Sequence, residues 1–157
     1  MQVFLIDYGV GNIGSLQKVL NLLNVETILP KNPNDLDKGE KFILPGVGSF
    51  SKCMELLNKT NWDQAIKHQV INLKKPLLGI CVGMQLLADY GFENDANVKC
   101  LGLGLIPGEV KKLSDIGCKL RVPHVGWNNV FAKKNILFSK IENGSDFYFV
   151  HSYTFIP

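Results

Sequence analysis

The sequence predicts an open, doubly wound α/β fold, in which helices flank a mostly parallel sheet. Short apolar runs alternate with stretches of helical periodicity over the first ninety residues, and glycine-rich turns follow three of those runs. This alternation is typical of a parallel sheet covered on both faces. The chain has 157 residues, of which 46% are hydrophobic, which suits one domain with a sizeable core. We therefore expect residues 1–157 to form a single domain.

The elements follow from local pattern. Apolar runs predict strands over 3–6, 26–29, 42–44 and 76–80, and apolar residues at helical spacing predict helices over 16–23, 49–58 and 62–73. Asn12 or Ser15 is expected to cap the first helix, and Asn61 to open the third. Beyond Tyr90, glycines and prolines separate shorter apolar stretches, and we expect a β-richer half with strands over 119–122, 130–131 and 147–153.

Composition excludes several classes of protein. The net charge of +3 comes from scattered lysines, so nucleic acid is not an expected partner. No apolar run approaches the ~20 residues of a membrane span, and the N-terminus lacks a basic signal region, so we expect no membrane association and a cytoplasmic location. Cys53, Cys81, Cys100 and Cys118 form no C-x-x-C pair and have no histidine at metal-ligand spacing. We expect reduced thiols, no metal and no cofactor.

The first glycine-rich turn spells G-x-G-x-x-G, from Gly9 to Gly14, between a predicted strand and a helix. This is the dinucleotide fingerprint in roughly the right context, but it also needs an acid at the end of the second strand. That strand has its acid, Glu26, at its start and is followed by Pro30 and Lys31. A tight turn that brings the loop close to something else is the better interpretation.

A second turn carries a candidate nucleophile. Gly79 and Gly83 flank Cys81 two residues away on each side, where a strand meets a helix. This is the pattern of G-x-S-x-G with sulfur in place of oxygen, in which flanking side chains would clash at a sharp turn. The helix N-terminus favours a thiolate, and the Val82 N–H is placed to stabilise an oxyanion. The alternative is a buried structural cysteine at a glycine-rich turn.

The third turn, Pro45-Gly46-Val47-Gly48, ends the neighbouring strand. Its two glycines let backbone N–H groups turn toward a ligand without obstruction by a Cβ. The turn could supply a second oxyanion donor opposite Val82, although a simple turn after a strand explains the same residues.

These residues resemble the class I (triad) glutamine amidotransferases, and most closely their imidazole glycerol phosphate synthase branch in histidine biosynthesis. The Gly-x-Cys-x-Gly-x-Gln elbow gives the superfamily, and two later segments are specific to this subunit type. The matching segments, in order along nearly the entire chain, are Asp7-Tyr8-Gly9-x-Gly11-Asn12, Leu44-Pro45-Gly46-Val47-Gly48, Gly79-Ile80-Cys81-Val82-Gly83-Met84-Gln85, Pro123-His124-Val125-Gly126-Trp127-Asn128 and Tyr148-Phe149-Val150-His151-Ser152-Tyr153.

The resemblance implies a glutaminase. The Cys81 thiolate would attack the side-chain amide of L-glutamine, form a glutamyl thioester and release ammonia. A (β/α)8-barrel cyclase, the other subunit of a heterodimer, would receive the ammonia through a channel and make imidazole glycerol phosphate and aminoimidazole carboxamide ribotide. The oxyanion and substrate-binding positions implied are Val47, Gly48, Val82, Gln85, Ser152 and Tyr153, and the partner-facing positions are Asn12, His124 and Trp127.

The sequence departs from the family pattern in the general base that activates the cysteine. The family's catalytic histidine and glutamate lie in a His-Pro-Glu segment, which does not occur in residues 1–157. His124 and His151 lie in other matching segments, and His68 is expected on a solvated helix face. We therefore expect a C-terminally truncated version of the fold that hydrolyses glutamine poorly or not at all, and an exposed sheet edge that promotes self-association.

Three other functions stay open at this point. A paralogous subunit could supply ammonia for amidation of surface sugars with the same chemistry. A non-catalytic scaffold could keep the fold without its triad. A hydrolase or chaperone of the PfpI type also has a cysteine elbow, but Gln85 and the His-Ser-Tyr strand argue against it.

Overall fold

The computed structural model spans residues 1–157 and describes all of them except 94–97 and 134–135. Contacts group the chain into two units, 1–111 with 155–157, and 112–154, and each is described by itself. The expectation of a single domain stays a prediction. In the described residues, no helix has the length and apolar character needed to cross a membrane.

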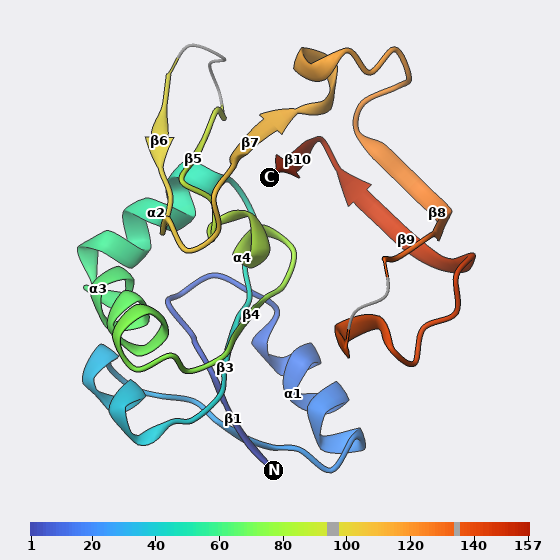
Figure 1. Ribbon diagram of the computed structural model, residues 1–157. Coiled ribbons are helices and arrows are strands. Elements are labelled where there is room, and N and C mark those ends of the chain that lie inside the picture. The colour runs from blue at the N-terminus through green and yellow to red at the C-terminus, as the bar shows by residue number, and fades with distance from the viewer. Residues whose placement is uncertain (94–97, 134–135) are drawn as a thin grey trace. The chain divides into compact units, whose positions relative to one another are not determined.

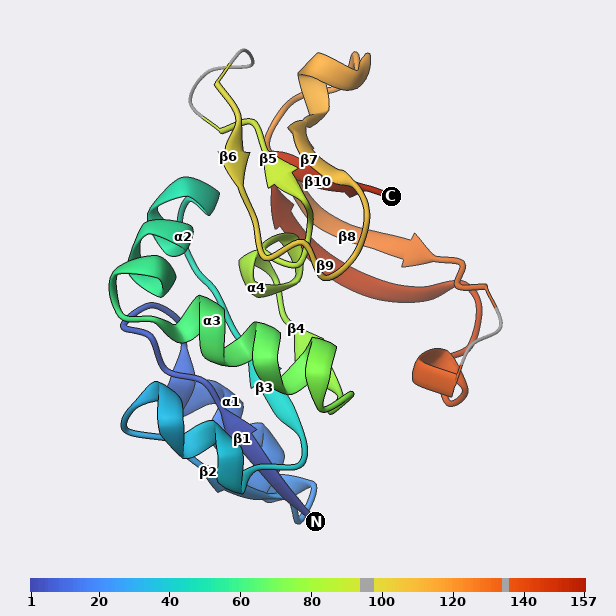
Figure 2. The ribbon, with the colours of Figure 1, turned by 60° about the vertical axis from the view of Figure 1, so that its left-hand side comes forward.

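A four-stranded sheet forms the centre of the first unit. Its order is β2 (Glu26–Ile28), β1 (Gln2–Leu5), β3 (Phe42–Leu44) and β4 (Leu77–Gly79), and every neighbouring pair is parallel. The predicted parallel α/β fold is confirmed. The chain runs from β1 to β2 on one side and returns to β3 on the other, so a topological switch point lies between β1 and β3 (Figures 1 and 2). Ligands of such sheets bind outside the carboxyl ends of the strands near this point.

Helices cover both faces of this sheet. The helix α1 (Ile13–Leu22) lies on one side, and α2 (Phe50–Lys59) and α3 (Trp62–Lys67) lie on the other (Figures 1 and 2). Asn12 caps α1, since its side chain accepts a hydrogen bond from the Ser15 N–H at 3.2 Å. The 3-10 helix η1 (Pro33–Lys38) leads from β2 toward β3.

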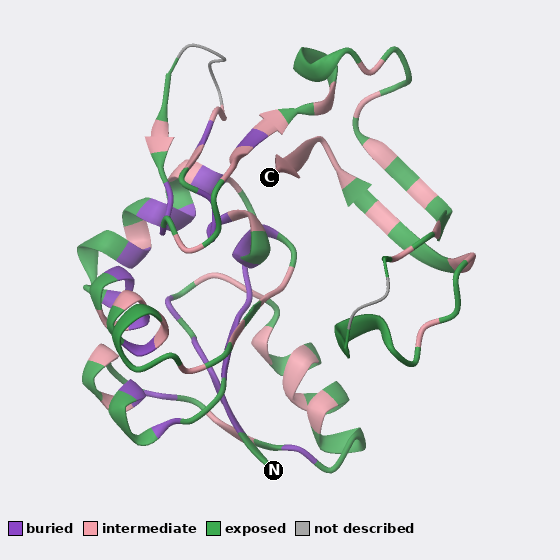
Figure 3. Ribbon diagram, in the orientation of Figure 1, coloured by how far each residue is buried: buried purple, intermediate pink, exposed green. Residues whose placement is uncertain are grey.

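Burial on both faces explains why β1 reads as a continuous apolar run. Val3 and Leu5 pack with Val25 and Ile43 against the α1 side, and Phe4 points to the other face and meets Phe42 edge to face at 6.1 Å. Successive strand residues point to opposite faces, so a strand covered twice needs an apolar residue at every position. Figure 3 shows the buried residues along β1 and β3.

A second sheet has the order β10 (Tyr153–Ile156), β7 (Glu109–Lys112), β5 (Tyr90–Gly91) and β6 (Cys100–Leu101). The pair β5–β7 is parallel and β5–β6 is antiparallel. The short helix α4 (Val82–Gln85) connects β4 toward this sheet.

The unit 112–154 holds a two-stranded antiparallel ribbon, β8 (His124–Val130) and β9 (Ser145–His151), in which His124 is opposite His151. The 3-10 helices η3 (Leu113–Ile116) and η4 (Ile136–Phe138) complete it. The expected strand at 147–153 is therefore found as β9 and the start of β10.

Three elements differ from the sequence expectation. The strand expected over 130–131 is only the end of the longer strand β8, and Phe131 lies outside it. Residues 119–122 form no strand: they bend toward Pro123, and Leu120 is 81% exposed, so the apolar positions of this stretch have no sheet face to pack on. The helix expected over 62–73 ends in a π-helical turn, η2 (His68–Asn72), after the α-helical part. His68 is exposed, as predicted.

Candidate active site

Cys81 lies directly after β4, in a backbone conformation that side chains rarely adopt. Its φ and ψ are 57° and −121°, and the Gly83 N–H donates to the Ile80 carbonyl at 3.0 Å. These values are those of the first central residue of a type II′ turn, a position that usually needs glycine. Such a conformation costs roughly 1–3 kcal/mol and persists only where its surroundings enforce it. The Cys81 side chain is exposed at this turn.

The flanking glycines enforce the turn by close approach. A Cβ at Gly79 would lie 2.5 Å from the Met84 Cα, and a Cβ at Gly83 would collide with the Leu44 carbonyl oxygen. The helix α4 therefore folds back against β4 and against the end of β3. No residue with a side chain fits at either position without moving this backbone.

The turn leaves one backbone donor available. The N–H groups of Gly83, Met84 and Gln85 donate to the carbonyls of Ile80 and Cys81. The Val82 N–H has no partner among the residues that the structure describes. It belongs to the residue that follows the thiol, which is the position of an oxyanion donor in a nucleophile elbow.

The Pro45–Gly48 loop lies against this turn because β3 and β4 are neighbours. The Ile80 N–H donates to the Leu44 carbonyl at 3.0 Å, and a Cβ at Gly46 would lie 2.6 Å from the Gly83 nitrogen and 3.0 Å from the Val82 Cβ. Gly48 is exposed and has a φ of 107°, which lets the loop bend at this point. The backbone of this loop therefore borders the elbow, where the sequence placed it.

A buried polar pair lies beneath the loop. Tyr8 is 5% exposed, and its hydroxyl would lie 3.0 Å from a Cβ at Gly46 and lies beside the Cys53 thiol. Burial raises the pKa of the Tyr8 hydroxyl far above its ordinary value, with the Cys53 thiol as a lesser cause. Burial also raises the pKa of the Cys53 thiol. Both groups therefore keep their protons at neutral pH.

The Gly9–Gly14 turn meets the same loop. A Cβ at Gly11 would lie 3.3 Å from the Pro45 ring, while a Cβ at Gly14 would have no atom within 4 Å. The third glycine of a dinucleotide fingerprint serves close packing of helix on strand, and Gly14 has no such contact. An open hollow of about 410 Å³ lies beside the turn, lined by Val10, Gly11, Asn12 and Val47.

The remaining predicted site residues, apart from half-buried Gln85 on α4, belong to the unit 112–154. His124 Nδ1 lies 3.1 Å from His151 Nε2, and His151 Nδ1 lies 2.9 Å from the Tyr153 carbonyl oxygen. A carbonyl only accepts, so His151 carries its proton on Nδ1 and, when neutral, accepts from His124. The Ser152 carbonyl accepts from the Leu113 N–H at 2.9 Å. Both histidines are thus engaged within their own unit.

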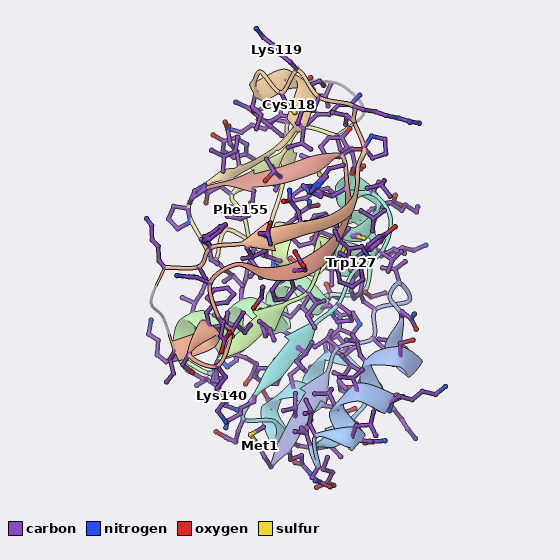
Figure 4. The ribbon with its side chains drawn as sticks, turned by 90° about the vertical axis from the view of Figure 1, so that its right-hand side faces the viewer. Met1, Cys118, Lys119, Trp127, Lys140 and Phe155 are labelled. Carbon is purple, nitrogen blue, oxygen red and sulfur yellow. The ribbon has the colours of Figure 1, made fainter. Side chains whose placement is uncertain are left out.

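Trp127 is 73% exposed and contacts Tyr148 edge to face, with ring centroids 5.6 Å apart. Trp127 and Tyr148 are opposite each other in the register of β8 and β9, and Figure 4 marks the position of Trp127 on this ribbon. An exposed tryptophan held by a neighbouring ring is typical of residues that bind a protein partner.

The first unit thus brings together Cys81, Val82 and the Pro45–Gly48 loop. The roles predicted for these residues, as nucleophile and oxyanion donors, stay predictions. Sequence reasoning assigned no role to Tyr8 or Cys53. The available signals were a tyrosine two residues after the predicted strand over 3–6 and a cysteine one helical turn beyond Ser49. In the described residues, no group of three or more histidine, cysteine, aspartate or glutamate side chains could hold a metal ion.

Comparison with known proteins decides the family. The family model of glutamine amidotransferase class I matches residues 4–157. The chain belongs to this family. The chain also has relatives that are 45% identical to it over almost its whole length.

Three of these relatives are named as imidazole glycerol phosphate synthase subunits. The HisH 1 subunit of Campylobacter jejuni strain RM1221 is 45% identical over 152 residues, which cover 96% of this chain and 74% of the relative. The HisH 1 subunit of Prochlorococcus marinus strain MIT 9313 is 45% identical, with 98% and 72% covered. The HisH subunit of Bacillus velezensis is 45% identical, with 94% and 69% covered.

Solved structures support the same fold. A crystal structure described as glutamine amidotransferase has a TM-score of 0.69 at 15% identity, and the match covers 97% of this chain and 72% of that one. A glutamine amidotransferase from Thermotoga maritima has a TM-score of 0.65 at 17% identity, with 99% and 62% covered. The class I glutamine amidotransferase fold expected from the sequence is confirmed.

The close approach at Gly83 is testable by adding one methyl group. We expect Gly83→Ala to lower the free energy of unfolding by about 1–3 kcal/mol or more, because its Cβ meets the Leu44 carbonyl. Gly14→Ala is the matched control: its Cβ meets open space in α1, and alanine favours a helix by up to ~1 kcal/mol. Chemical denaturation measures both, and an equal effect of the two substitutions would contradict the packing described for the elbow.

Proposed function

We propose that the chain is the glutaminase subunit of an imidazole glycerol phosphate synthase, with Cys81 as the nucleophile. The supporting observation is the exposed Cys81 thiol on a strained type II′ turn, next to the Val82 N–H, which has no partner among the described residues. A buried structural cysteine would not need this backbone. The names of the relatives at 45% identity support the pathway.

The chemistry follows from these groups. The Cys81 thiolate attacks the side-chain amide carbon of L-glutamine, a C–S bond forms, and the carbonyl electron pair moves to oxygen. The N–H groups of Val82 and Gly48 stabilise this oxyanion. The C=O re-forms as the C–N bond breaks, and the departing nitrogen takes the proton that the Cys81 thiol gave up, so that ammonia leaves. Water attacks the resulting thioester, which releases glutamate and restores the thiol.

The other predicted positions hold the substrate and the partner. Gln85, Ser152 and Tyr153 bind glutamine, and Asn12, His124 and Trp127 face a (β/α)8-barrel cyclase that takes the ammonia. Support for the partner-facing role comes from Asn12 beside the open hollow next to Val47, and from the exposed ring of Trp127. Delivery of ammonia to a bound partner would protect it from protonation and loss to water.

The nucleophile is testable by covalent labelling. In the full-length protein, the glutamine analogue 6-diazo-5-oxo-norleucine should alkylate Cys81 with loss of dinitrogen, glutamine should protect the thiol, and Cys81→Ala should abolish both labelling and glutamine hydrolysis. Cys118→Ala is the matched control, because Cys118 is another free cysteine that is not fully buried. Mass spectrometry of the labelled peptide identifies the site. Labelling of another cysteine, or full glutaminase activity in Cys81→Ala, would overturn the proposal.

The partner surface is testable by truncating Trp127. Because its ring is 73% exposed, Trp127→Ala should leave the thermal midpoint of unfolding nearly unchanged, while affinity for the cyclase subunit falls by roughly tenfold or more, as for an interface hot spot. Phe131→Ala is the matched control, since Phe131 is 77% exposed. Titration calorimetry measures the affinities. Equal affinity of wild type and Trp127→Ala would remove this residue from the interface.

A further inference from the structure

One buried thiol contacts the loop beside the elbow. Cys53 is 1% exposed, and its Sγ donates a hydrogen bond to the Val47 carbonyl oxygen at 3.8 Å. Cys53 lies in the first turn of α2, where its own N–H donates to the Ser49 carbonyl at 3.0 Å. The thiol therefore reaches back from the helix to the loop that precedes it.

This contact fixes the direction of a peptide group. In a planar trans peptide, the C=O of one residue and the N–H of the next point in opposite directions. Since the Val47 carbonyl points to the buried Cys53 thiol, the Gly48 N–H points away from it, to the outer side of the loop. Gly48 is exposed, and its N–H has no partner among the described residues.

Side-chain packing does little to fix the orientation of the peptide group between Val47 and Gly48. The Val47 side chain is 58% exposed, and a Cβ at Gly48 would meet no atom within 4 Å. Neither residue is therefore held by core packing, and the carbonyl contact is what orients the peptide between them. An apolar side chain at position 53 would fill the same buried space without this effect.

A second buried group supports the thiol. The Tyr8 hydroxyl has no hydrogen-bond partner of ordinary geometry among the described residues, although its oxygen is fully buried. It lies beside the Cys53 thiol and under Gly46. A sulfur accepts hydrogen bonds weakly and a thiol donates weakly, so a hydroxyl directed at the sulfur leaves the S–H proton for the Val47 carbonyl.

We propose that Cys53 is a positioning residue that turns the Gly48 N–H toward the oxyanion, and that Tyr8 orients the Cys53 thiol. This inference rests on the proposed function, because it assigns the N–H of Gly48 to the oxyanion of the reaction at Cys81. Cys53 touches neither substrate nor the reacting atoms, and its effect passes through one peptide group.

The test separates the oxyanion from the nucleophile. In the full-length protein with its cyclase partner, we expect Cys53→Val to lower kcat for glutamine by about tenfold, less than loss of an entire oxyanion donor, with KM nearly unchanged. The aldehyde analogue of glutamine, γ-glutamyl semialdehyde, should also bind more weakly to Cys53→Val than to the wild type. The Cys81 sulfur adds to its carbonyl carbon, and the carbonyl oxygen takes the negative charge or the thiol proton, so this adduct depends on the same oxyanion donors. Alkylation of Cys81 by iodoacetamide, which forms no oxyanion, should keep its rate.

Conservative and matched variants complete the design. Cys53→Ser keeps a donor and should retain most of kcat. Cys100→Val is the control, because the Cys100 Sγ also donates to a carbonyl at 3.8 Å, but to that of Leu101 instead of one in the Pro45–Gly48 loop. Tyr8→Phe should lower kcat while the thermal midpoint changes little, since the buried hydroxyl that it removes faces only a weak acceptor, the Cys53 sulfur.

Each result decides the inference. An unchanged kcat in Cys53→Val and Tyr8→Phe overturns it. So does a fall in kcat that is equally large in Cys53→Ser. A parallel fall in the rate of Cys81 alkylation by iodoacetamide also overturns it, because that reaction forms no oxyanion. If Cys53→Val does not fold, Cys53→Ser and Tyr8→Phe give the answer. Glutamine hydrolysis that survives Cys81→Ala would instead refute the proposed function, so the two failures are distinguishable.

Discussion

The site depends on the close approach of the α4 backbone to the end of β3. Glycine at 46, 79 and 83 lets the first turn of the helix lie directly on the Leu44 carbonyl and the Pro45–Gly48 loop. This packing holds Cys81 in a conformation that costs roughly 1–3 kcal/mol in isolation. It also places Val82 against Gly46 of the loop. The strain at the thiol and the availability of the Val82 N–H thus have one cause.

Burial separates the thiols of the first unit into two chemical classes. It raises the pKa of both the Cys53 and the Cys100 thiols, and the Glu93 carboxylate adds to the effect at Cys100. A thiol with a raised pKa stays protonated at neutral pH and is a poor nucleophile. Cys81 is exposed. The same core that stabilises the sheet therefore suppresses reaction at the other sulfurs and keeps the Cys53 proton available for the Val47 carbonyl.

Local pattern was enough to predict the four parallel strands and the cysteine elbow, because each is encoded by adjacent residues. A doubly buried strand such as β1 must be apolar throughout, and a nucleophile on a sharp turn needs its glycines. The proximity of Tyr8 and Cys53 was not predictable, since they lie 45 positions apart in the sequence and only the β1–β3 pairing brings their segments together. The strand expected at 119–122 was wrong because alternation alone does not say whether a face exists to bury Leu120.

The glycine-rich turn at 9–14 shows why a motif needs its contacts to be read. Spacing alone fits a dinucleotide fingerprint, yet a Cβ at Gly14 would meet nothing, so helix and strand do not approach closely there. The crowded glycine is Gly11, whose neighbour is the Pro45 ring. The turn therefore supports the loop of the elbow from behind, and Asn12 and Val47 border one hollow. The same turn thus contacts the Pro45–Gly48 loop through Gly11 and borders the open hollow through Asn12, so its glycines serve packing and exposure rather than a phosphate.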